Sequence, residues 1–344
     1  MLRLVFAALV LLLAPAALAQ TAPKPIVIGE THSITSRVLG QERRIAVRLP
    51  TGYADKPGAR YPVVYVIDGG PEQDFPHLAG LAQSADVNGT LEPFILVGIE
   101  TVKRREEITP AVKDMAPYVA ELGQAPGGSA NFRRFIAQDV KPWVEARYRT
   151  SGHDAVMGES LAGLFVVETL FAEPALFDDY IAVSPSLWWD DMKFGREARD
   201  YLRRVPPGPR RLYLTLADEG YRHEQGVNQL VAALKAGAPA DLQWLYVPQG
   251  DFETHASIYH GAALDAWRAF YGTPSRIYLP GPLISGRPMR ERTAAENQRR
   301  GREYTRAVAR RVTPADTRGS DDRFAYECLL YDLGPRARNG RFDR

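Results

Sequence analysis

The sequence predicts an α/β fold with a mostly parallel, doubly wound central sheet that carries helices on both faces. Two observations predict it. Nearly unbroken apolar runs of strand length recur along the chain, as strands that are covered on both faces require. Between these runs, apolar residues recur at spacings of three and four, which indicates helices. In such sheets ligands bind beyond the carboxyl ends of the strands, so the loops that follow strands are where functional residues are expected.

The expected strands extend through most of the chain. The first, at residues 45–49, alternates apolar and polar side chains and is predicted to be an edge strand that Pro50 and Gly52 end. The buried strands are predicted from the apolar runs at residues 61–67, 94–99, 155–157, 180–183, 211–216 and 242–247. Because helices separate them, right-handed crossovers are expected to make these strands parallel.

Three helices are expected between and after these strands. The longest has one broad apolar face, made by Phe132, Phe135, Ile136, Val140, Trp143, Val144 and Tyr148. Pro142 is expected to kink it, because proline lacks the N–H that an α-helix uses. Two further helices are predicted near residues 227–234 and 262–270.

The two ends of the chain differ from its middle. Residues 1–19 have the pattern of a secretory leader: Arg3, an apolar run over residues 4–13, and an A-x-A cleavage site at residues 17–19. The apolar run has ten residues, whereas a membrane span needs about 20. The chain is therefore expected to be exported, to the periplasm or outside the cell, with no membrane span and with one folded domain over residues 25–274.

Residues 275–344 form a basic extension that holds sixteen arginines, no lysine and nine acidic residues. Its charges are interspersed and its aromatic residues few, so it is expected to be partly helical or disordered and not to bind nucleic acid. Cys328 is the only cysteine of the chain, which excludes an intrachain disulfide. The chain also lacks the H-E-x-x-H and C-x-x-C motifs, so neither a metal nor another cofactor is expected.

A nucleophile elbow is predicted where a short apolar run leads into Gly158-Glu159-Ser160 and a second apolar stretch follows. Strand, sharp turn and helix in this order hold a serine hydroxyl clear of the sheet. Small residues are needed around the serine because strand and helix nearly touch there. Gly158 meets this requirement, whereas the second usual glycine is replaced by Ala162 and followed by Gly163.

A serine hydroxyl becomes a strong nucleophile when a base takes its proton and an acid orients that base. His255 follows the last predicted strand and precedes the last predicted helix, so it is the expected base. The acid is expected after residues 211–216, where Asp218 and Glu219 are adjacent and Glu224 is a third, weaker candidate. Glu219 is preferred because its longer side chain suits a position further into the loop, and Asp218 remains the alternative.

Backbone N–H groups should stabilise the oxyanion that forms when the serine attacks a carbonyl. One is expected from Leu161, the residue after the nucleophile, and a second from Gly69 or Gly70 in the loop after residues 61–67.

Taken in order, these motifs resemble the putative-esterase family of the α/β hydrolases over roughly residues 30–272. The resemblance is carried by residues 43–53, 66–69, 97–110, 127–150, 184–189 and 253–257. That family includes esterases of trilactone siderophores and neighbours feruloyl esterases and S-formylglutathione hydrolase. The resemblance implies an α/β-hydrolase fold with Ser160 as nucleophile, His255 as base and Glu219 as acid, although some family members work with a Ser–His dyad.

The expected function is that of a secreted serine hydrolase, which cleaves a small-molecule carboxylic ester through an acyl-enzyme on Ser160. Siderophore esters and aryl esters are the candidate substrates, and Trp188, Trp189 and Arg105 are expected to line the substrate pocket. Two alternatives remain open. One is an acyltransferase on the same fold, and the other is a non-catalytic scaffold that binds anionic partners through the basic extension.

Overall fold

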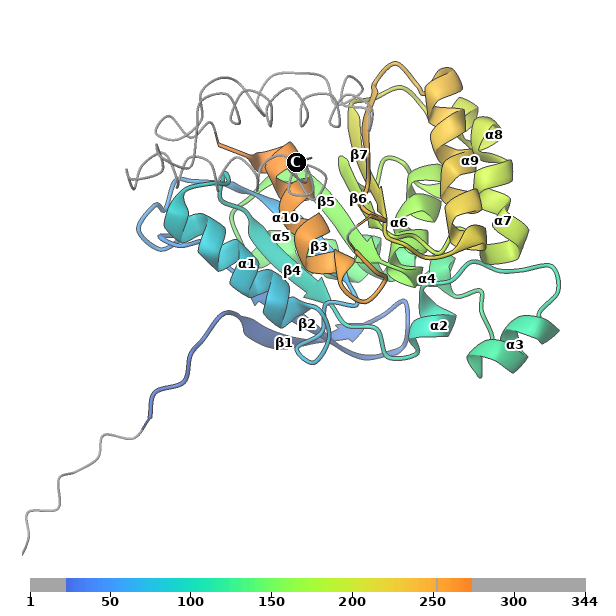
Figure 1. The fold of residues 1–344 in the computed structure, drawn as a ribbon. Coiled ribbons are helices and arrows are strands. Elements are labelled where there is room, and N and C mark those ends of the chain that lie inside the picture. The colour runs from blue at the N-terminus through green and yellow to red at the C-terminus, as the bar shows by residue number, and fades with distance from the viewer. Residues whose placement is uncertain (1–22, 252, 274–344) are drawn as a thin grey trace, which may run out of the picture.

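The structure is a computed structural model that describes residues 23–251 and 253–273. One eight-stranded sheet forms the centre of this part of the chain, in the order β1-β2-β4-β3-β5-β6-β7-β8 (Figure 1). The predicted leader at residues 1–19 and the extension at residues 275–344, with Cys328, lie outside the described residues.

The strands match the predicted apolar runs closely. They are β1 Glu30–Ser36, β2 Gln41–Arg48, β3 Tyr61–Ile67, β4 Ile95–Ile99, β5 Thr150–Glu159, β6 Asp179–Val183, β7 Arg210–Leu216 and β8 Leu242–Pro248. β2 pairs antiparallel with β1 and β4, and every other neighbouring pair from β4 to β8 is parallel. The mostly parallel sheet that the sequence predicts is therefore confirmed.

The prediction that β2 is an edge strand is wrong, because β1 covers its outer side. The polar residue of the predicted stretch, Arg48, does not face solvent, and neither does Arg43, which precedes that stretch in β2. Arg43 is buried and donates to both carboxylate oxygens of Glu107, at 2.6 and 2.9 Å. Arg48 is buried as well and forms an ion pair with Asp86. Buried arginines that are paired in this way look like solvent-facing residues in the sequence.

The helices are α1 Phe75–Asn88, α2 Arg104–Glu107, α3 Ala116–Leu122, α4 Ser129–Phe135, α5 Lys141–Arg147, α6 Leu161–Ala172, α7 Trp189–Arg196, α8 Ala198–Arg204, α9 Tyr221–Gly237 and α10 Ile258–Tyr271. The helix predicted over residues 132–148 is present and continues from α4 to α5 through a π-helical turn, η1 Ile136–Val140. Pro142 lies in the first turn of α5, directly after this π-helical turn. The irregular turn thus stands where proline, which lacks an N–H, disturbs regular α-helical hydrogen bonding.

Two apolar clusters lie on opposite faces of the sheet, as the alternation of side chains along β3 shows. Tyr65 and Ile67 pack in the cluster that α4 to α9 cover, whereas Val64 and Val66 pack in the cluster beneath α1 and α10. Figure 1 shows α1 and α10 next to each other on one face of the sheet. Helices therefore cover both faces, as predicted. Within the described ranges, no helix has both the length and the apolar character needed to cross a bilayer.

A buried ionic network around Asp179 joins the strands at their amino ends, away from the loops that follow them. The Asp179 side chain is fully buried and accepts hydrogen bonds from His153 Nε2 at 2.8 Å, Arg211 Nε at 2.6 Å and the Tyr271 hydroxyl at 2.9 Å. Burial opposes ionisation of Asp179, but the hydrogen bonds from His153 and Arg211 outweigh it and lower the pKa of the carboxyl. The network ties β5, β6, β7 and α10 together.

We expect Asp179→Asn to lower the free energy of unfolding by about 3 kcal/mol, because removal of one partner from a buried ion pair leaves the other charge uncompensated. Asp200→Asn is the matched control, since it breaks the exposed Arg203–Asp200 pair of 3.0 Å and should cost less than about 1 kcal/mol. Urea denaturation measures both changes. Equal losses in the two variants would contradict a stabilising role for the network.

Candidate active site

Ser160 stands at a sharp turn between β5 and α6, in a backbone conformation that few non-glycine residues adopt. Its φ is 62° and its ψ is −119°, outside the regions open to most L-residues. Neighbouring backbone holds it there. The Ser160 N–H donates to Val183 O at 3.0 Å, and the Ser186 N–H donates to Ser160 O at 3.0 Å. Strain of this kind persists only where the surrounding structure fixes it, and it is often found at functional sites.

The small residues around Ser160 let strand and helix approach closely, as the sequence predicts. A Cβ atom added at Gly158 would lie 2.6 Å from the Ala162 methyl group, and one at Gly163 would lie 2.8 Å from Val183 O. Both distances are too short for real Cβ contacts. Ala162 is fully buried against Gly158 and fits the elbow, so its presence in place of the usual glycine leaves the turn intact.

The structure brings Ser160, His255 and Glu219 together from three separate loops. His255 Nε2 lies 3.0 Å from Ser160 Oγ, and His255 Nδ1 lies 2.6 Å from Glu219 Oε2. The Glu219 side chain is 2% exposed, whereas Asp218 and Glu224 are exposed to solvent. Of the three acids that the sequence offered, Glu219 is therefore the one in contact with the imidazole.

The hydrogen bond between Glu219 and His255 shifts the pKa values of both residues. Burial raises the pKa of Glu219, but the hydrogen bond to His255 and further interactions outweigh it and hold that pKa below its usual range. The same hydrogen bond raises the pKa of His255, against the effect of burial. Because Glu219 stays ionised, it favours the tautomer that carries a proton on Nδ1 and leaves Nε2 to face the serine.

Three neighbouring strands end in residues with positive φ at this edge of the sheet. Asp68 follows β3 with a φ of 61°, Ser160 follows β5, and Ser184 follows β6 with a φ of 41°. Asp68 is buried and accepts hydrogen bonds from Thr101 and from Arg104 Nε. The carboxyl edge of the sheet, where the fold predicts a ligand site, is thus where strained residues gather.

The oxyanion donors predicted after β3 need correction. The Gly69 N–H donates to Ile99 O at 2.9 Å, and the Gly70 N–H donates to the Gln73 side-chain oxygen at 2.9 Å. Both groups therefore already have acceptors inside the protein. Leu161 opens α6, and the first intrahelical bond, from Leu164 N–H to Ser160 O at 2.9 Å, lies beyond its own N–H. The leading N–H groups of a helix lack intrahelical partners and suit an anion.

Trp188 and Trp189, which were predicted to line the substrate pocket, lie in different surroundings. Trp188 is partly buried and packs edge-on against His223, with ring centroids 5.9 Å apart, and His223 in turn lies 5.9 Å from the His255 ring. Trp189 is fully buried against Tyr118. Its prediction as a pocket residue is corrected, because a side chain without exposed surface belongs to the core.

Arg105 was the arginine predicted to line the pocket, but Arg104 is the arginine that faces the site. Arg105 is exposed on α2, whereas Arg104 is anchored by Asp68, and its charge opposes the rise in the pKa of His255 that the hydrogen bond to Glu219 causes. The two arginines are adjacent in the sequence, and the sequence pattern did not show which of them faces the site.

Sequence reasoning missed two ionisable residues near the imidazole. Glu159 Oε1 lies 3.2 Å from His255 Nε2, and His223 Nε2 lies 3.5 Å from Glu219 Oε2. The position of Glu159 beside the nucleophile was a signal available in the sequence. His223 had no such signal, since it reaches the site from the first turn of α9.

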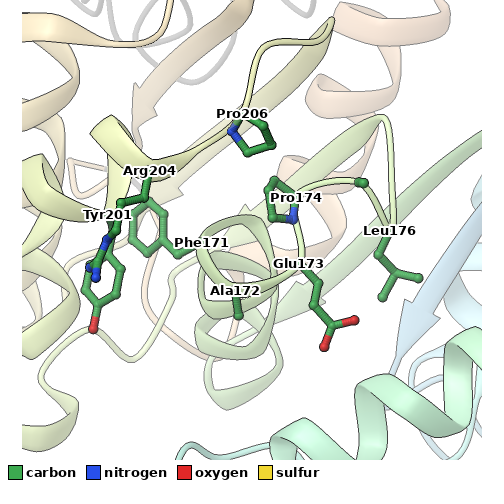
Figure 2. A pocket seen from close by; sticks show the side chains of 9 residues that line it. Phe171, Ala172, Glu173, Pro174, Leu176, Tyr201, Arg204 and Pro206 are labelled. Carbon is green, nitrogen blue, oxygen red and sulfur yellow. The ribbon is translucent and has the colours of Figure 1, made fainter.

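A separate pocket lies at the opposite end of the parallel strands from Ser160. It has a volume of about 700 Å³ and is lined by the loop between α6 and β6, together with Tyr201, Arg204 and Pro206 (Figure 2). These residues precede β6 and β7, so they lie at the amino ends of the strands, away from Ser160. In the described residues, no cluster of three or more His, Cys, Asp or Glu side chains is arranged to hold a metal ion.

Comparisons with known proteins show the family and the fold of the chain. The sequence model of the family described as "Putative esterase" matches residues 36–266. The chain is 37% identical over 107 residues to the siderophore enterobactin esterase of Emericella nidulans, which is 29% of this chain and 35% of that protein. It is 29% identical over 176 residues to the ferri-bacillibactin esterase BesA of Bacillus subtilis, which is 47% of this chain and 59% of that protein. The match therefore spans less than two thirds of the length of either relative.

A solved structure shows the same fold. The crystal structure of an IroE-like serine hydrolase from Shewanella oneidensis superposes with a TM-score of 0.64, over 88% of this chain and 99% of that chain, at 22% sequence identity.

Proposed function

Because the chain belongs to the putative-esterase family, we propose that it is a serine hydrolase that cleaves carboxylic esters. The observation that carries the proposal is the unbroken line of contacts from Ser160 Oγ through His255 to Glu219, at 3.0 and 2.6 Å. These distances lie within the range over which a base takes a proton from a nucleophile.

In this proposal, Ser160 Oγ attacks the ester carbonyl while His255 Nε2 takes the hydroxyl proton. Glu219 holds the imidazole through Nδ1–H and stabilises the positive charge that forms on it. The Leu161 N–H donates to the oxyanion. His255 then gives its proton to the leaving alcohol, and a water molecule, activated by the same base, releases the acid from the acyl-enzyme.

Hydrolysis is favoured over acyl transfer by the exposure of the base. Within the described residues the His255 side chain is 44% exposed, so water can reach an acyl group beside the base. The intact set of serine, base and acid also argues against a non-catalytic scaffold. We therefore propose an esterase, with acyl transfer to an alcohol as the alternative.

A siderophore ester or an aryl ester is the substrate class that we propose. Two relatives are named a siderophore enterobactin esterase and a ferri-bacillibactin esterase, and Trp188 offers an aromatic surface near the His255 side of the site. We also propose export, on the leader pattern of residues 1–19. N-terminal sequencing of protein recovered from a bacterial periplasm should begin at Gln20, and an intact Met1 would contradict export.

A panel of esters tests the function. We expect the full chain to hydrolyse short p-nitrophenyl esters and to release free acid from a trilactone siderophore, with a fluorophosphonate probe labelling the protein at Ser160. Folded protein that neither hydrolyses any ester of the panel nor accepts the probe would contradict the proposal.

A further inference from the structure

Glu159 lies beside the nucleophile and faces the base, yet no step of the proposed reaction uses it. It is the last residue of β5, its side chain is 17% exposed, and its Oε1 atom is buried. That oxygen lies 3.2 Å from His255 Nε2, within ion-pair distance, and accepts no hydrogen bond from the residues that the structure describes. Ser160 Oγ lies 3.0 Å from the same nitrogen. Two groups therefore compete for one atom of the imidazole.

The competition has a chemical consequence, because only an unprotonated Nε2 accepts the proton of Ser160. An ionised Glu159 attracts a proton onto Nε2 and then accepts a hydrogen bond from it. A protonated Glu159 instead donates its own O–H to Nε2. In both arrangements a single proton lies between Glu159 and His255 and occupies the position that the serine hydroxyl needs.

The charged groups around the pair come from several elements. Glu219 and His223 face it from the β7–α9 side, Arg104 from α2 and Asp74 from the start of α1. The two carboxylates favour a proton on the pair, whereas Arg104 opposes it. Burial lowers the pKa of His223 and so favours its neutral form.

The balance of these influences supports a shared proton near neutral pH. Burial raises the pKa of Glu159 to about 7, against the attraction of His255 and Arg104. The hydrogen bond that His255 donates to Glu219 raises the pKa of His255, and the nearby Glu159 charge raises it further, against burial.

We propose that Glu159 and His255 hold one proton between them and that its loss to solvent, which leaves a carboxylate and a neutral imidazole, makes Ser160 reactive. The inference rests on the proposed ester hydrolysis. The direction of the pH dependence follows: activity is low while the pair holds its proton and rises with pH as the proton leaves. Without the negative charge of Glu159, His255 loses its proton at lower pH. Glu159 is thus a positioning residue that sets the pH at which the activity begins to rise.

The pH profile of ester hydrolysis tests this role. We expect Glu159→Gln to move the acid limb of kcat/KM by about one pH unit toward lower pH, as removal of a neighbouring opposite charge does. At the foot of the wild-type limb, the variant should retain up to about tenfold more of its own plateau activity. Glu224→Gln is the matched control, because Glu224 is exposed on α9 and its loss removes the same charge without moving the limb.

A second measurement does not depend on activity. NMR titration of the imidazole signals, with His255 assigned by their loss in His255→Gln, should give a lower pKa for His255 in Glu159→Gln than in the wild type. Glu159→Leu serves as a second variant if glutamine disturbs folding, and it should shift the pKa in the same direction. An unchanged His255 pKa in these variants, or a limb that stays in place, overturns the inference. Inactivity of the wild-type protein toward every ester would instead overturn the proposed function, and the NMR titration would still decide the role of Glu159.

Discussion

Replacement of Ser160 with alanine is expected to lower kcat/KM for ester hydrolysis by at least about 10⁴-fold, because loss of the nucleophile in comparable serine hydrolases removes nearly all catalysis. The residual rate should come from binding and from the Leu161 N–H alone. The fold should be unaffected, since the alanine methyl group occupies the position of the serine Cβ. Steady-state kinetics on p-nitrophenyl esters measure the loss, and thermal unfolding checks the fold.

The matched control for this variant is Ser84→Ala, a change of the same chemistry at an exposed position of α1. It should leave kcat/KM unchanged, and the fluorophosphonate probe should label it as it labels the wild type. Equal rates for Ser160→Ala and the wild type would mean that hydrolysis occurs elsewhere on the protein or in a contaminant.

Substitution of the orienting acid is expected to have the second largest effect. Glu219→Gln keeps the size of the side chain but removes the charge that fixes the His255 tautomer, so kcat should fall by about 10³- to 10⁴-fold. Asp218→Asn is the control from the adjacent position. Asp218 is exposed, and its charge should change the rate by less than about fivefold, since exposed ion interactions contribute up to about 1 kcal/mol.

The pair of variants distinguishes three arrangements. A large loss in Glu219→Gln alone supports the triad that we propose. A large loss in Asp218→Asn alone would identify the other acid and require the loop to move. Losses below about tenfold in both would mean that Ser160 and His255 act as a dyad, with the acid contributing little to the barrier.

Much of the fold was predictable because parallel strands buried on both faces have a strong signature. β3 is the clearest example, since its unbroken apolar run matches the strand residue by residue. β1 gave no such signal, because its residues are mostly polar and one of its edges is unpaired. β2 was placed at the edge for a related reason: Arg48, the polar residue of the predicted stretch, forms a buried ion pair with Asp86, which lies far along the chain, and the local pattern does not show this.

The approximate position of the site was predictable for a topological reason. In a parallel sheet, residues that follow strands meet at one edge, so the order of Ser160, Glu219 and His255 along the chain was enough to group them. Which backbone N–H groups near the site already have acceptors inside the protein was not predictable. The N–H groups of Gly69 and Gly70 have acceptors supplied by Ile99 and Gln73, and only the three-dimensional packing decides this.

The turn at Ser160 also limits how this protein can evolve. A φ of 62° is open to an unbranched side chain under local constraint, but it is a severe outlier for a β-branched one. Threonine, which carries the same hydroxyl, is therefore excluded at this position by its second branch at Cβ, whereas cysteine has the shape of serine and fits. Descendants of this enzyme can exchange oxygen for sulfur as the attacking atom, but the main chain closes the path to a secondary alcohol.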